Sequence, residues 1–273
     1  WVSAARAPAH TLEASVTRAV VAARGARGLI LPLGLLALWS LLGTTPERAF
    51  YFVPPGKIAA ALFEVAGTGE LLRALQSSLR MALFGLVWGG LLGLTVGVAL
   101  GTSRLLDRAL GPSLHGFRQV PLLGLAPLVS LWLGNGEAPK TLMVLLAVFF
   151  PIFVNSHDGV RALDRRMLEV ARVFGLSQLA VLRRVVLPGI APFFFTGLSQ
   201  AVAFVWLATI GSELLFTAGS GLGTMMSTAQ AAARMDVVLV CVVTIGLAGL
   251  SVNAVVRRLG GRVMRWRDLE VPA

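Results

Sequence analysis

The sequence predicts an all-α, polytopic membrane protein with six transmembrane helices. Of its 273 residues, 56% are hydrophobic and only 14% are charged, and the mean hydropathy is +0.80. A soluble domain of this length would need far more charge on its surface. The apolar residues also gather in long stretches separated by short basic segments, as expected for helices that each need about 20 apolar residues to cross a bilayer.

The apolar stretches define the six spans in order. The first is expected over residues 29–43, and it must extend into flanking small residues to cross a bilayer. A cleaved signal peptide has a similar pattern, but no small-x-small cleavage site clearly follows. An amphipathic piece from Lys57 to about Val65 is expected to lie on the membrane surface outside the cytoplasm. The other spans are expected over residues 81–101, 109–133, 141–157, 189–216 and 237–256. The third and fourth are candidates for kinked helices, and the third contains three prolines.

A glycine recurs at every fourth position of the second span. The residues are Gly85, Gly89, Gly93, Gly97 and Gly101. They leave one face of the helix without side chains, so another helix can approach it closely. We interpret this face as a site of structural packing between helices. The alternative is a helix contact along which the two helices slide.

Basic residues predict that both ends of the chain lie in the cytoplasm, because Lys and Arg accumulate in cytoplasmic loops. Of the 24 lysines and arginines, 17 lie in the two tails and in the loops after the second and fourth spans, and 6 lie in the opposite loops. We therefore expect cytoplasmic tails over residues 1–28 and 258–273, on either side of a membrane domain over residues 29–257.

Composition and motifs argue against several functions. The net charge of +11 could suit a nucleic-acid-binding protein, but the arginines are not interleaved with base-stacking aromatic residues. A single cysteine excludes an internal disulfide, and three scattered histidines argue against a metal site. Gly56-Lys57 is followed by Ile58, so the chain has no phosphate-binding loop for ATP, and no nucleophile or paired-carboxylate motif of an enzyme occurs.

Residues 161–188 form a charged loop between two apolar stretches and contain a predicted helix-turn-helix over residues 164–188. Its apolar positions fall on one helical face: Leu163, Met167, Val170 and Phe174. Gly175 follows where a left-handed residue would end the helix, and Ser177 can cap a second helix. Pro188 is expected to end that second helix.

This segment resembles the signature loop of the permeases of binding-protein-dependent ABC importers. The loop has a Glu-Ala-Ala stretch, a glycine four residues beyond it and a Leu-Pro about a dozen residues further on. The matching residues are Glu169-Val170-Ala171, Gly175 and Leu187-Pro188, with Val170 as the one departure. In the family this loop is a cytoplasmic coupling helix that docks on a separate ATPase subunit, whereas the alternative is an ordinary surface hairpin. The resemblance therefore implies an ATPase-coupling role for Glu169, Ala171, Arg172, Gly175, Leu176, Ser177 and Gln178.

Nearly all of residues 30–267 resembles the sulfonate, taurine and nitrate branch of these permeases. Matching stretches include residues 52–57, 128–137 and 213–215, and the Gly-Leu-Gly at residues 221–223. The chain departs from the family pattern at Gln119, Ser199 and Thr224. These departures fall where a substrate could pass. The identity of the substrate therefore stays open, whereas the class of transport protein does not.

The resemblance implies the type I ABC importer permease fold, with cytoplasmic coupling helices, in a bacterial inner membrane. The implied partners are a second copy of the permease, two ATPase subunits that bind ATP and Mg, and an extracytoplasmic substrate-binding protein. This chain would itself be no enzyme and would bind no cofactor and no nucleic acid. The complex would import a small anion, such as an aliphatic sulfonate, taurine or nitrate, by alternating access. The alternative, a stand-alone secondary transporter or channel, would need coupling-ion carboxylates or an inverted repeat, and neither is evident.

Polar residues within the spans are candidates for a substrate pathway, because they are costly in hydrocarbon and tend to line cavities. Such residues include Asn155 and His157 at the end of the fourth span. The predicted pathway residues are Arg118 and Gln119 in the third span and Ser199, Gln200 and Thr209 in the fifth. An arginine with neutral donors suits an anion. As alternatives, Arg118 would extend to the cytoplasmic interface and Gln200 would bond a neighbouring helix. Glu213, near the outer end of the fifth span, is expected to have a structural partner.

Overall fold

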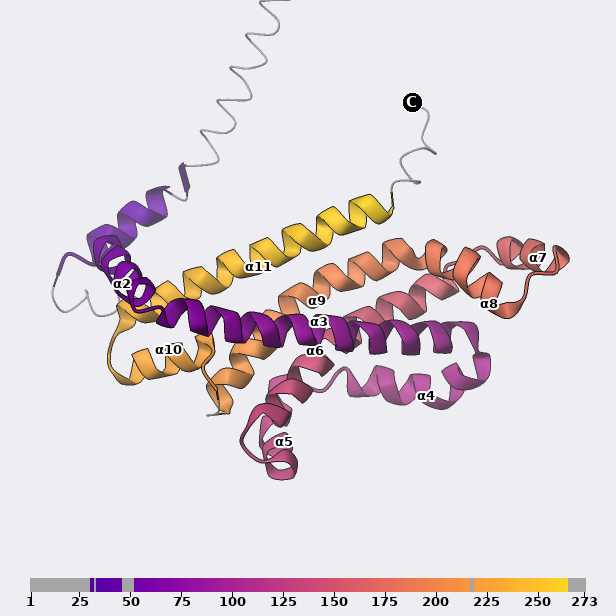
Figure 1. Ribbon diagram of the computed structural model, residues 1–273, viewed down its shortest axis with the longest axis horizontal. Coiled ribbons are helices and arrows are strands. Elements are labelled where there is room, and N and C mark those ends of the chain that lie inside the picture. The colour runs from indigo at the N-terminus through magenta and orange to yellow at the C-terminus, as the bar shows by residue number, and fades with distance from the viewer. Residues whose placement is uncertain (1–29, 32, 46–51, 217–218, 265–273) are drawn as a thin grey trace, which may run out of the picture. The chain divides into compact units, whose positions relative to one another are not determined.

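The computed structural model describes residues 30–31, 33–45, 52–216 and 219–264, and these residues form helices without a strand among them (Figure 1). The expected tail over residues 1–28 and the last nine residues of the expected C-terminal tail lie outside the described residues. The chain divides into two units, Trp1–Ala60 and Ala61–Ala273. In the first unit, part of the expected first span forms a short apolar helix, Leu33–Leu42. The indole N–H of Trp39 in this helix donates to the carbonyl of Val53 at 2.8 Å.

Helix α2 (Pro55–Gly67) covers the expected amphipathic segment and runs from the first unit into the second. In the second unit, four helical segments are long and apolar enough to cross a membrane. They are α3 (Glu70–Thr102), α6 (Glu137–Arg161), the continuous segment Gln178–Leu215 and α11 (Met235–Val263). These helices contain the expected second, fourth, fifth and sixth spans. The last helix continues to Val263, beyond the expected boundary at residue 257.

The expected third span is broken rather than kinked. Helix α4 (Arg104–Phe117) is separated from the 3-10 turn η1 (Leu122–Leu125) and α5 (Ala126–Leu133), and the two parts meet at 89°. Pro121 provides the physical reason, because it has no N–H to donate and disfavours a helical conformation at Val120. The expected interruption of this span by proline is therefore found at Pro121, but as a break of 89° rather than a kink. The described residues supply four crossings by length and composition, or five if this bent pair counts as one.

The expected helix end at Pro188 is also wrong. Helix α8 (Gln178–Val181) continues through the π-helical stretch η2 (Leu182–Val186) into α9 (Leu187–Leu215). Across this stretch the N–H of Leu187 donates to the carbonyl of Leu182, five residues back. Pro188 then stands in the first turn of α9, where its missing N–H does not interrupt the widened helical turn. Residues 178–215 therefore form one continuous helix.

The glycine face of α3 packs directly against α6, as the sequence predicts. A Cβ atom added at Gly89, Gly93 or Gly97 would come within 2.6 or 2.7 Å of a carbonyl oxygen of α6. Helix α9 also packs against α6, so α6 takes part in a core that includes Val144, Val148 and Ile152. In Figure 1 the axes of α3, α6 and α9 are similarly oriented, and the chain runs along α9 in the direction opposite to α3 and α6.

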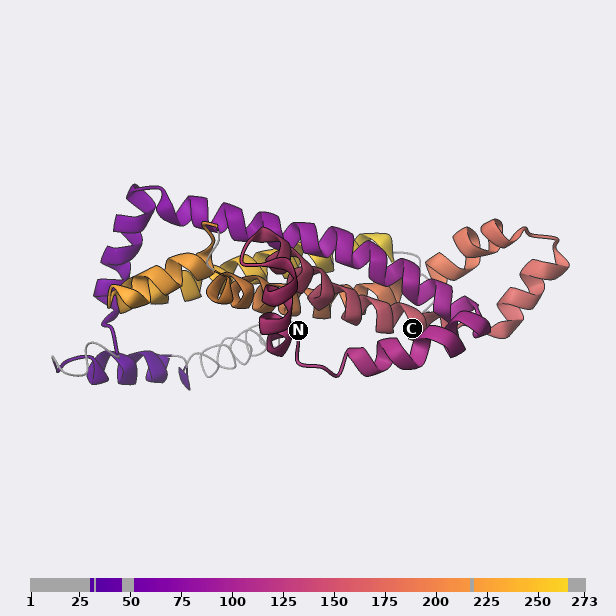
Figure 2. The ribbon, with the colours of Figure 1, turned by 90° about the horizontal axis from the view of Figure 1, so that it is seen from below.

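Two short helical regions lie at opposite ends of these long helices. Helix α7 (Arg165–Val173) and α8 form a hairpin that projects beyond the ends of the long helices (Figure 2). Helix α10 (Leu222–Ala231) lies at the other end, between α9 and α11 in sequence (Figure 1). The hairpin contains the residues that resemble the signature loop.

Candidate functional site

The turn of the α7–α8 hairpin has a defined backbone conformation. Gly175 has a φ angle of 68°, in the left-handed region. The N–H of Leu176 donates to the carbonyl of Ala171 at 3.1 Å, and the N–H of Gly175 donates to the carbonyl of Arg172 at 2.9 Å. These two bonds form a Schellman motif, which satisfies the last carbonyls of α7. The prediction that Gly175 ends the helix in a left-handed conformation is confirmed.

Side-chain caps begin both helices of the hairpin. The carboxylate of Asp164 accepts from the N–H of Arg166 at 2.9 Å, and the hydroxyl of Ser177 accepts from the N–H of Ala180 at 3.3 Å. Such caps stabilise a helix start by satisfying otherwise free N–H groups. The expected cap at Ser177 is confirmed. The hairpin therefore has a defined backbone structure and is not an irregular loop.

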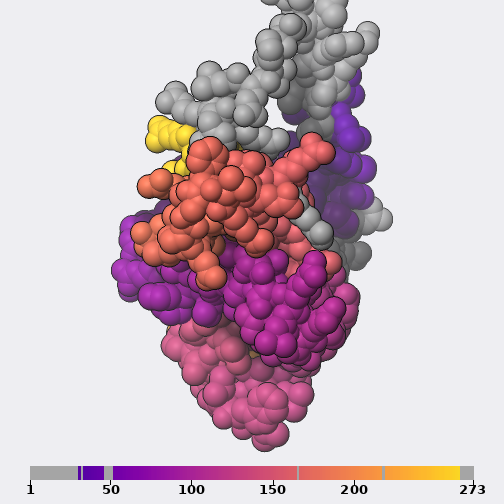
Figure 3. All heavy atoms as spheres, turned by 90° about the vertical axis from the view of Figure 1, so that its right-hand side faces the viewer, coloured from indigo at the N-terminus to yellow at the C-terminus, as the bar shows by residue number. Residues whose placement is uncertain are grey.

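The hairpin exposes an apolar face. Met167, Val170, Val173 and Phe174 are each between 54% and 87% exposed. Figure 3 shows the end of the molecule at which the hairpin lies. Leu163 and Leu168 instead pack against a small core formed by α3, α6 and α9. Contiguous exposed apolar side chains of this kind mark an interaction surface.

The predicted coupling residues differ in their exposure to solvent. Glu169, Arg172, Gly175, Ser177 and Gln178 are exposed, Leu176 is half-buried, and Ala171 is buried. The exposed charged and polar side chains are available to a partner. Ala171 and Gly175 instead take part in the hydrogen bonds that shape the turn.

A groove of about 430 Å³ opens at the break in the third span. Its walls come from the residues around the break, from α6 and from α9. Its polar lining consists of Arg118, Gln119, Asn155 and Gln200, and its aromatic lining of Phe117, Phe150 and Phe204. The break therefore places the side chains of two predicted pathway residues, Arg118 and Gln119, beside a third from a distant helix.

A hydrogen bond links α6 to α9 in this groove. The side-chain amide of Asn155 donates to the carbonyl of Pro151 at 2.8 Å and to Oε1 of Gln200 at 3.1 Å. The expectation that Gln200 bonds a neighbouring helix is confirmed, and the same side chain also lines the groove. Because Asn155 orients Gln200, the amide nitrogen of Gln200 remains able to donate to a ligand.

The charge in the groove is positive. Arg118 forms no ion pair within the described part of the chain, and no aspartate or glutamate is among the described residues that line the groove. One guanidinium with amide donors and aromatic walls can hold a small oxyanion, because the guanidinium fork matches two of its oxygens. The arrangement offers binding and orientation, not a nucleophile or a proton-transfer group.

The other two predicted pathway residues do not line this groove. Ser199 lines a second groove, between α9 and α11. Thr209 is fully buried, and its hydroxyl has no hydrogen-bond partner among the described residues. Asn155 stands among the polar residues of the fourth span in the sequence, but it is not one of the predicted pathway residues. Its polarity within an apolar stretch was the available signal.

Glu213 is held in a buried cluster near α10. The hydroxyl of Ser78, in α3, lies 2.7 Å from one carboxylate oxygen of Glu213, and the N–H of Gly223 donates to the other oxygen at 2.7 Å. The N–H of Leu222 donates to the Ser78 hydroxyl at 2.8 Å. The expectation of a structural partner for Glu213 is confirmed. The cluster ties the start of α10 to α3 and α9.

An exposed ion pair lies at the same end. One nitrogen of Arg234 lies 2.8 Å from a carboxylate oxygen of Glu64 and 3.0 Å from one of Asp236. The hydrogen bonds from Arg234 lower the pKa of Glu64 below its ordinary value. This contact ties α2 to the start of α11.

A second polar cluster, built around the buried ring of His157, lies at the hairpin end. The ring of His157 lies 3.0 Å from a carboxylate oxygen of Asp107 and 3.3 Å from one of Asp158. Arg161 approaches the other oxygen of Asp107 at 3.4 Å. The cluster joins α4 to the end of α6 and was not predicted. Among the described residues no group of three His, Cys, Asp or Glu side chains could hold a metal ion.

The long apolar helices place the chain among polytopic membrane proteins, with an interaction surface at one end and a cationic groove between the helices. Residues 89–265 match the family of binding-protein-dependent transport system inner membrane components. The chain belongs to this family, so it is a transport permease rather than an enzyme in its own right.

Several relatives are named for the transport of sulfonates or taurine. A protein of Escherichia coli named for aliphatic sulfonates transport, the permease protein SsuC, is 35% identical over 86% of this chain and 90% of its own length. A Bacillus subtilis protein of the same name is 31% identical over 89% and 88%. The taurine transport system permease protein TauC of Escherichia coli is 30% identical over 88% of this chain and 90% of its own length. By name, these relatives are transport permeases for aliphatic sulfonates and taurine.

Among solved structures, an inward-facing form of the MetNI methionine ABC transporter contains a similar chain. The TM-score is 0.56, the identity is 18%, and the match covers 71% of this chain and 97% of that chain. At this identity the likeness shows the fold alone. The expected type I ABC importer permease fold is thereby confirmed.

Proposed function

We propose that this chain is the membrane permease of an ATP-driven importer for a small anion, such as an aliphatic sulfonate, taurine or nitrate. It would act as a pair of copies with two ATPase subunits and an extracytoplasmic substrate-binding protein. ATP and Mg would be bound by the ATPases, and this chain would bind no cofactor. It would lie in the bacterial inner membrane, with the hairpin and both tails, residues 1–28 and 258–273, in the cytoplasm.

The exposed hairpin is the observation that carries this proposal. Its apolar side chains Met167, Val170, Val173 and Phe174 remain exposed on a capped and tightly turned element. A surface helix of a soluble region normally buries such a face. Since the face lies at the end of the long helices, it fits a separate subunit that docks there. Glu169 and Arg172 provide exposed charged groups on the same helix.

The continuous helix from the hairpin to the groove supports a coupling mechanism. Gln178 in the hairpin and Gln200 in the groove lie on one uninterrupted helical segment, about 33 Å apart at 1.5 Å per residue. A displacement of the hairpin would therefore be transmitted along this helix to the groove lining. When the ATPases bind ATP and close, the two hairpins would draw together and open the pathway outward, and hydrolysis would reverse this change.

The groove determines the proposed class of substrate. Arg118, Gln119 and Gln200 present a positive charge and neutral donors, and no described lining residue is acidic. A small oxyanion would be attracted by Arg118 and oriented by the amides. The names of the relatives, which refer to sulfonates and taurine, support the same chemistry.

The experiment alters the hairpin turn. Gly175→Val places a β-branched side chain at a φ of 68°, which costs about 1–3 kcal/mol of backbone strain. Gly175→Asn is the matched control, because asparagine tolerates the left-handed conformation. We expect Gly175→Val to uncouple ATP hydrolysis from uptake in proteoliposomes, with the protein still inserted in the membrane, and Gly175→Asn to retain most coupling.

A second variant tests docking directly. Glu169→Ala removes an exposed charge without altering the turn, so it should reduce the amount of ATPase that co-purifies with the permease. Normal uptake and normal ATPase co-purification in both Gly175→Val and Glu169→Ala would show that the hairpin is an ordinary surface loop.

A further inference from the structure

Helix α4, which carries Arg118 at its end, has few apolar contacts with the rest of the described structure. Gly111 is the only buried residue of this helix. The ring centroid of His115 lies 5.4 Å from that of Phe153 in α6. The ring centroid of Phe117 lies 5.9 Å from that of Phe150, also in α6. A stripe of buried apolar side chains, which usually holds a helix against its neighbours, is missing, so the position of α4 depends on polar contacts as well.

Asp107 makes the polar contacts near the start of α4. One oxygen of its carboxylate lies 3.0 Å from Nε2 of His157 in α6, whose side chain is only 4% exposed. Because an ionised carboxylate can only accept, the ring of His157 donates this hydrogen bond. The other oxygen lies 3.4 Å from Arg161, whose side chain is 63% exposed, and an exposed ion pair contributes little. The hydrogen bond with His157 is therefore the stronger link between the two helices.

A glycine leaves room for this hydrogen bond. A Cβ atom added at Gly111, one turn after Asp107, would lie 2.9 Å from the carboxylate oxygen that faces His157. A larger residue at this position would crowd that oxygen. The close approach of Asp107 to His157 therefore depends on the shape of this face of α4 as well as on the charge of the carboxylate.

Asp107 and Arg118 lie on the same face of α4. They are about three helical turns apart at 3.6 residues per turn, and Gly111 and Leu114 lie between them on this face. Arg118 has φ −62° and ψ −17°, in the right-handed helical region, so the register of the helix extends to it. A rotation of α4 that separates Asp107 from His157 would therefore also turn Arg118 away from the groove.

We propose that Asp107 and His157 position Arg118 in the groove. The hydrogen bond between them fixes the rotation of α4 against α6, and this rotation places Arg118 beside Asn155 and Gln200. Asp107 and His157 are positioning residues, since neither lines the groove. The inference rests on the proposed function, in which Arg118 attracts the transported anion.

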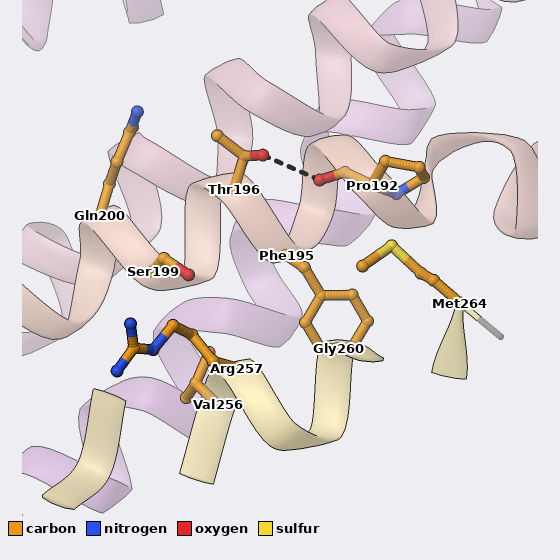
Figure 4. Close-up of a pocket in the computed structure, with 9 residues that line it drawn as sticks. All are labelled: Pro192, Phe195, Thr196, Ser199, Gln200, Val256, Arg257, Gly260 and Met264. Carbon is orange, nitrogen blue, oxygen red and sulfur yellow. Dashed lines mark hydrogen bonds between the residues drawn. The ribbon is translucent and has the colours of Figure 1, made fainter. Parts of the chain in front are cut away.

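The first test measures the reactivity of Arg118 in the purified complex. Phenylglyoxal modifies arginine side chains, and peptide mass spectrometry gives the rate at each arginine. In Asp107→Ala, Arg118 should react faster by about twofold or more, the smallest population shift expected from loss of one hydrogen bond. Arg257 is the internal control, because it lines the groove between α9 and α11, to which α4 contributes no residue (Figure 4). The rate at Arg257 should not change.

Asp158→Ala is the matched control for this test. A carboxylate oxygen of Asp158 lies 3.3 Å from Nδ1 of His157, but both residues belong to α6, so this contact does not reach α4. The variant should leave the reactivity of Arg118 unchanged. Asp107→Asn keeps a carbonyl acceptor for the ring of His157, so its reactivity at Arg118 should lie between those of the wild type and Asp107→Ala.

The second test determines whether Asp107 acts through Arg118. Uptake of ethanesulfonate is measured in proteoliposomes that contain the whole complex, at saturating binding protein. Asp107→Ala should lower uptake about twofold to tenfold, the population shift expected from loss of a typical hydrogen bond. In an Arg118→Gln background the same substitution should lower uptake less than about twofold, because the effects of two residues that act through one another do not add.

Three results would overturn the proposal. An unchanged rate at Arg118 in Asp107→Ala would show that the aromatic contacts hold α4 by themselves. Equal changes at Arg118 and Arg257, or in Asp107→Ala and Asp158→Ala, would show a general loosening of the structure. Equal losses of uptake with and without Arg118 would show that Asp107 acts elsewhere. Failure of the proposed function appears separately, as normal coupling in the hairpin variants, and does not alter the reactivity of Arg118.

Discussion

At the scale of single residues, Arg118 has the clearest chemical role. It stands where α4 ends, and its backbone N–H donates to the carbonyl of Leu114 at 3.2 Å. The break that follows leaves its side chain on the groove wall, beside amides from α6 and α9. A regular helix through residues 118–121 would have spaced these side chains along a different face. The role of Arg118 therefore depends on the loss of helical structure after it.

Replacement of Arg118 tests the anion pathway. Arg118→Gln should lower uptake of an anionic substrate about tenfold or more, because a charge-assisted hydrogen bond contributes about 1.5–3 kcal/mol. Arg118→Lys should restore uptake only in part, since the lysine cannot form the two-pronged contact. The measurement is uptake into proteoliposomes that contain the whole complex, at saturating binding protein.

Arg108→Gln is the control for this series. Arg108 is exposed on the same helix but does not line the groove. ATPase assembly should be normal in all three variants. Uptake by Arg118→Gln at the wild-type rate would mean that Arg118 serves only to anchor the helix in the membrane.

At the scale of elements, the contact between α3 and α6 is the most extensive in the described fold. Backbone carbonyls of α6 fill the space that side chains at the α3 glycines would occupy. Such close approach replaces large interlocking side chains with many short backbone contacts, as small-residue faces do in membrane helices. The contact joins the first long helix to the helix that supplies Asn155 to the groove.

Gly93→Ala tests this packing. Its Cβ would lie 2.6 Å from the carbonyl oxygen of Phe149, so the helices must separate, at a cost of about 1–3 kcal/mol. Gly246→Ala in α11 is the matched control, since no atom lies within 4 Å of its Cβ position. Thermal unfolding can be followed with a thiol-reactive dye, because the single cysteine, Cys241, is fully buried. Equal midpoints for both variants would show that the seam is loosely packed.

A separate experiment tests the hydrogen bonds of Ser78 that connect α3 to α10. Ser78→Ala leaves the buried N–H of Leu222 without its acceptor and removes a hydrogen bond from Glu213, at a cost of about 1–3 kcal/mol. We expect the segment around Gly221 to become sensitive to limited proteolysis in this variant. Ser227→Ala, at an exposed position of α10, should leave the cleavage rate unchanged. Protection equal to that of the wild type would show that other contacts hold α10.

At the scale of the whole molecule, the proposed function depends on which end faces the cytoplasm. The hairpin and α10 lie at opposite ends of the long helices (Figure 1). The ATPases can dock on the hairpin only if that end faces inward. The basic residues of the sequence predict this orientation.

Single-cysteine labelling tests the orientation in intact cells. In a Cys241→Ala background, Ser177→Cys should react with a membrane-impermeant maleimide only after the cells are opened. Gln230→Cys should react in intact cells. Both positions are exposed in the described structure. The reverse pattern would contradict the proposed topology and, with it, the coupling role of the hairpin.

The sequence by itself determined the class of the protein and its local turns. Apolar length and low charge indicated membrane helices, and the glycine period indicated a close helix contact. The spacing around Gly175 and Ser177 predicted the hairpin, because capping and left-handed turns depend on a few neighbouring residues. These features are encoded within one or two helical turns, so they can be deduced without knowledge of distant contacts.

Only the tertiary structure decided which polar residues share a site. It placed Asn155 and Gln200 beside Arg118, directed Ser199 into a separate groove and buried Thr209 in the core. It also showed that the chain breaks at Pro121 yet continues as a helix through Pro188. A proline removes the same N–H at both positions, and the surrounding hydrogen bonds and helix packing decide whether a π-helical turn absorbs that loss.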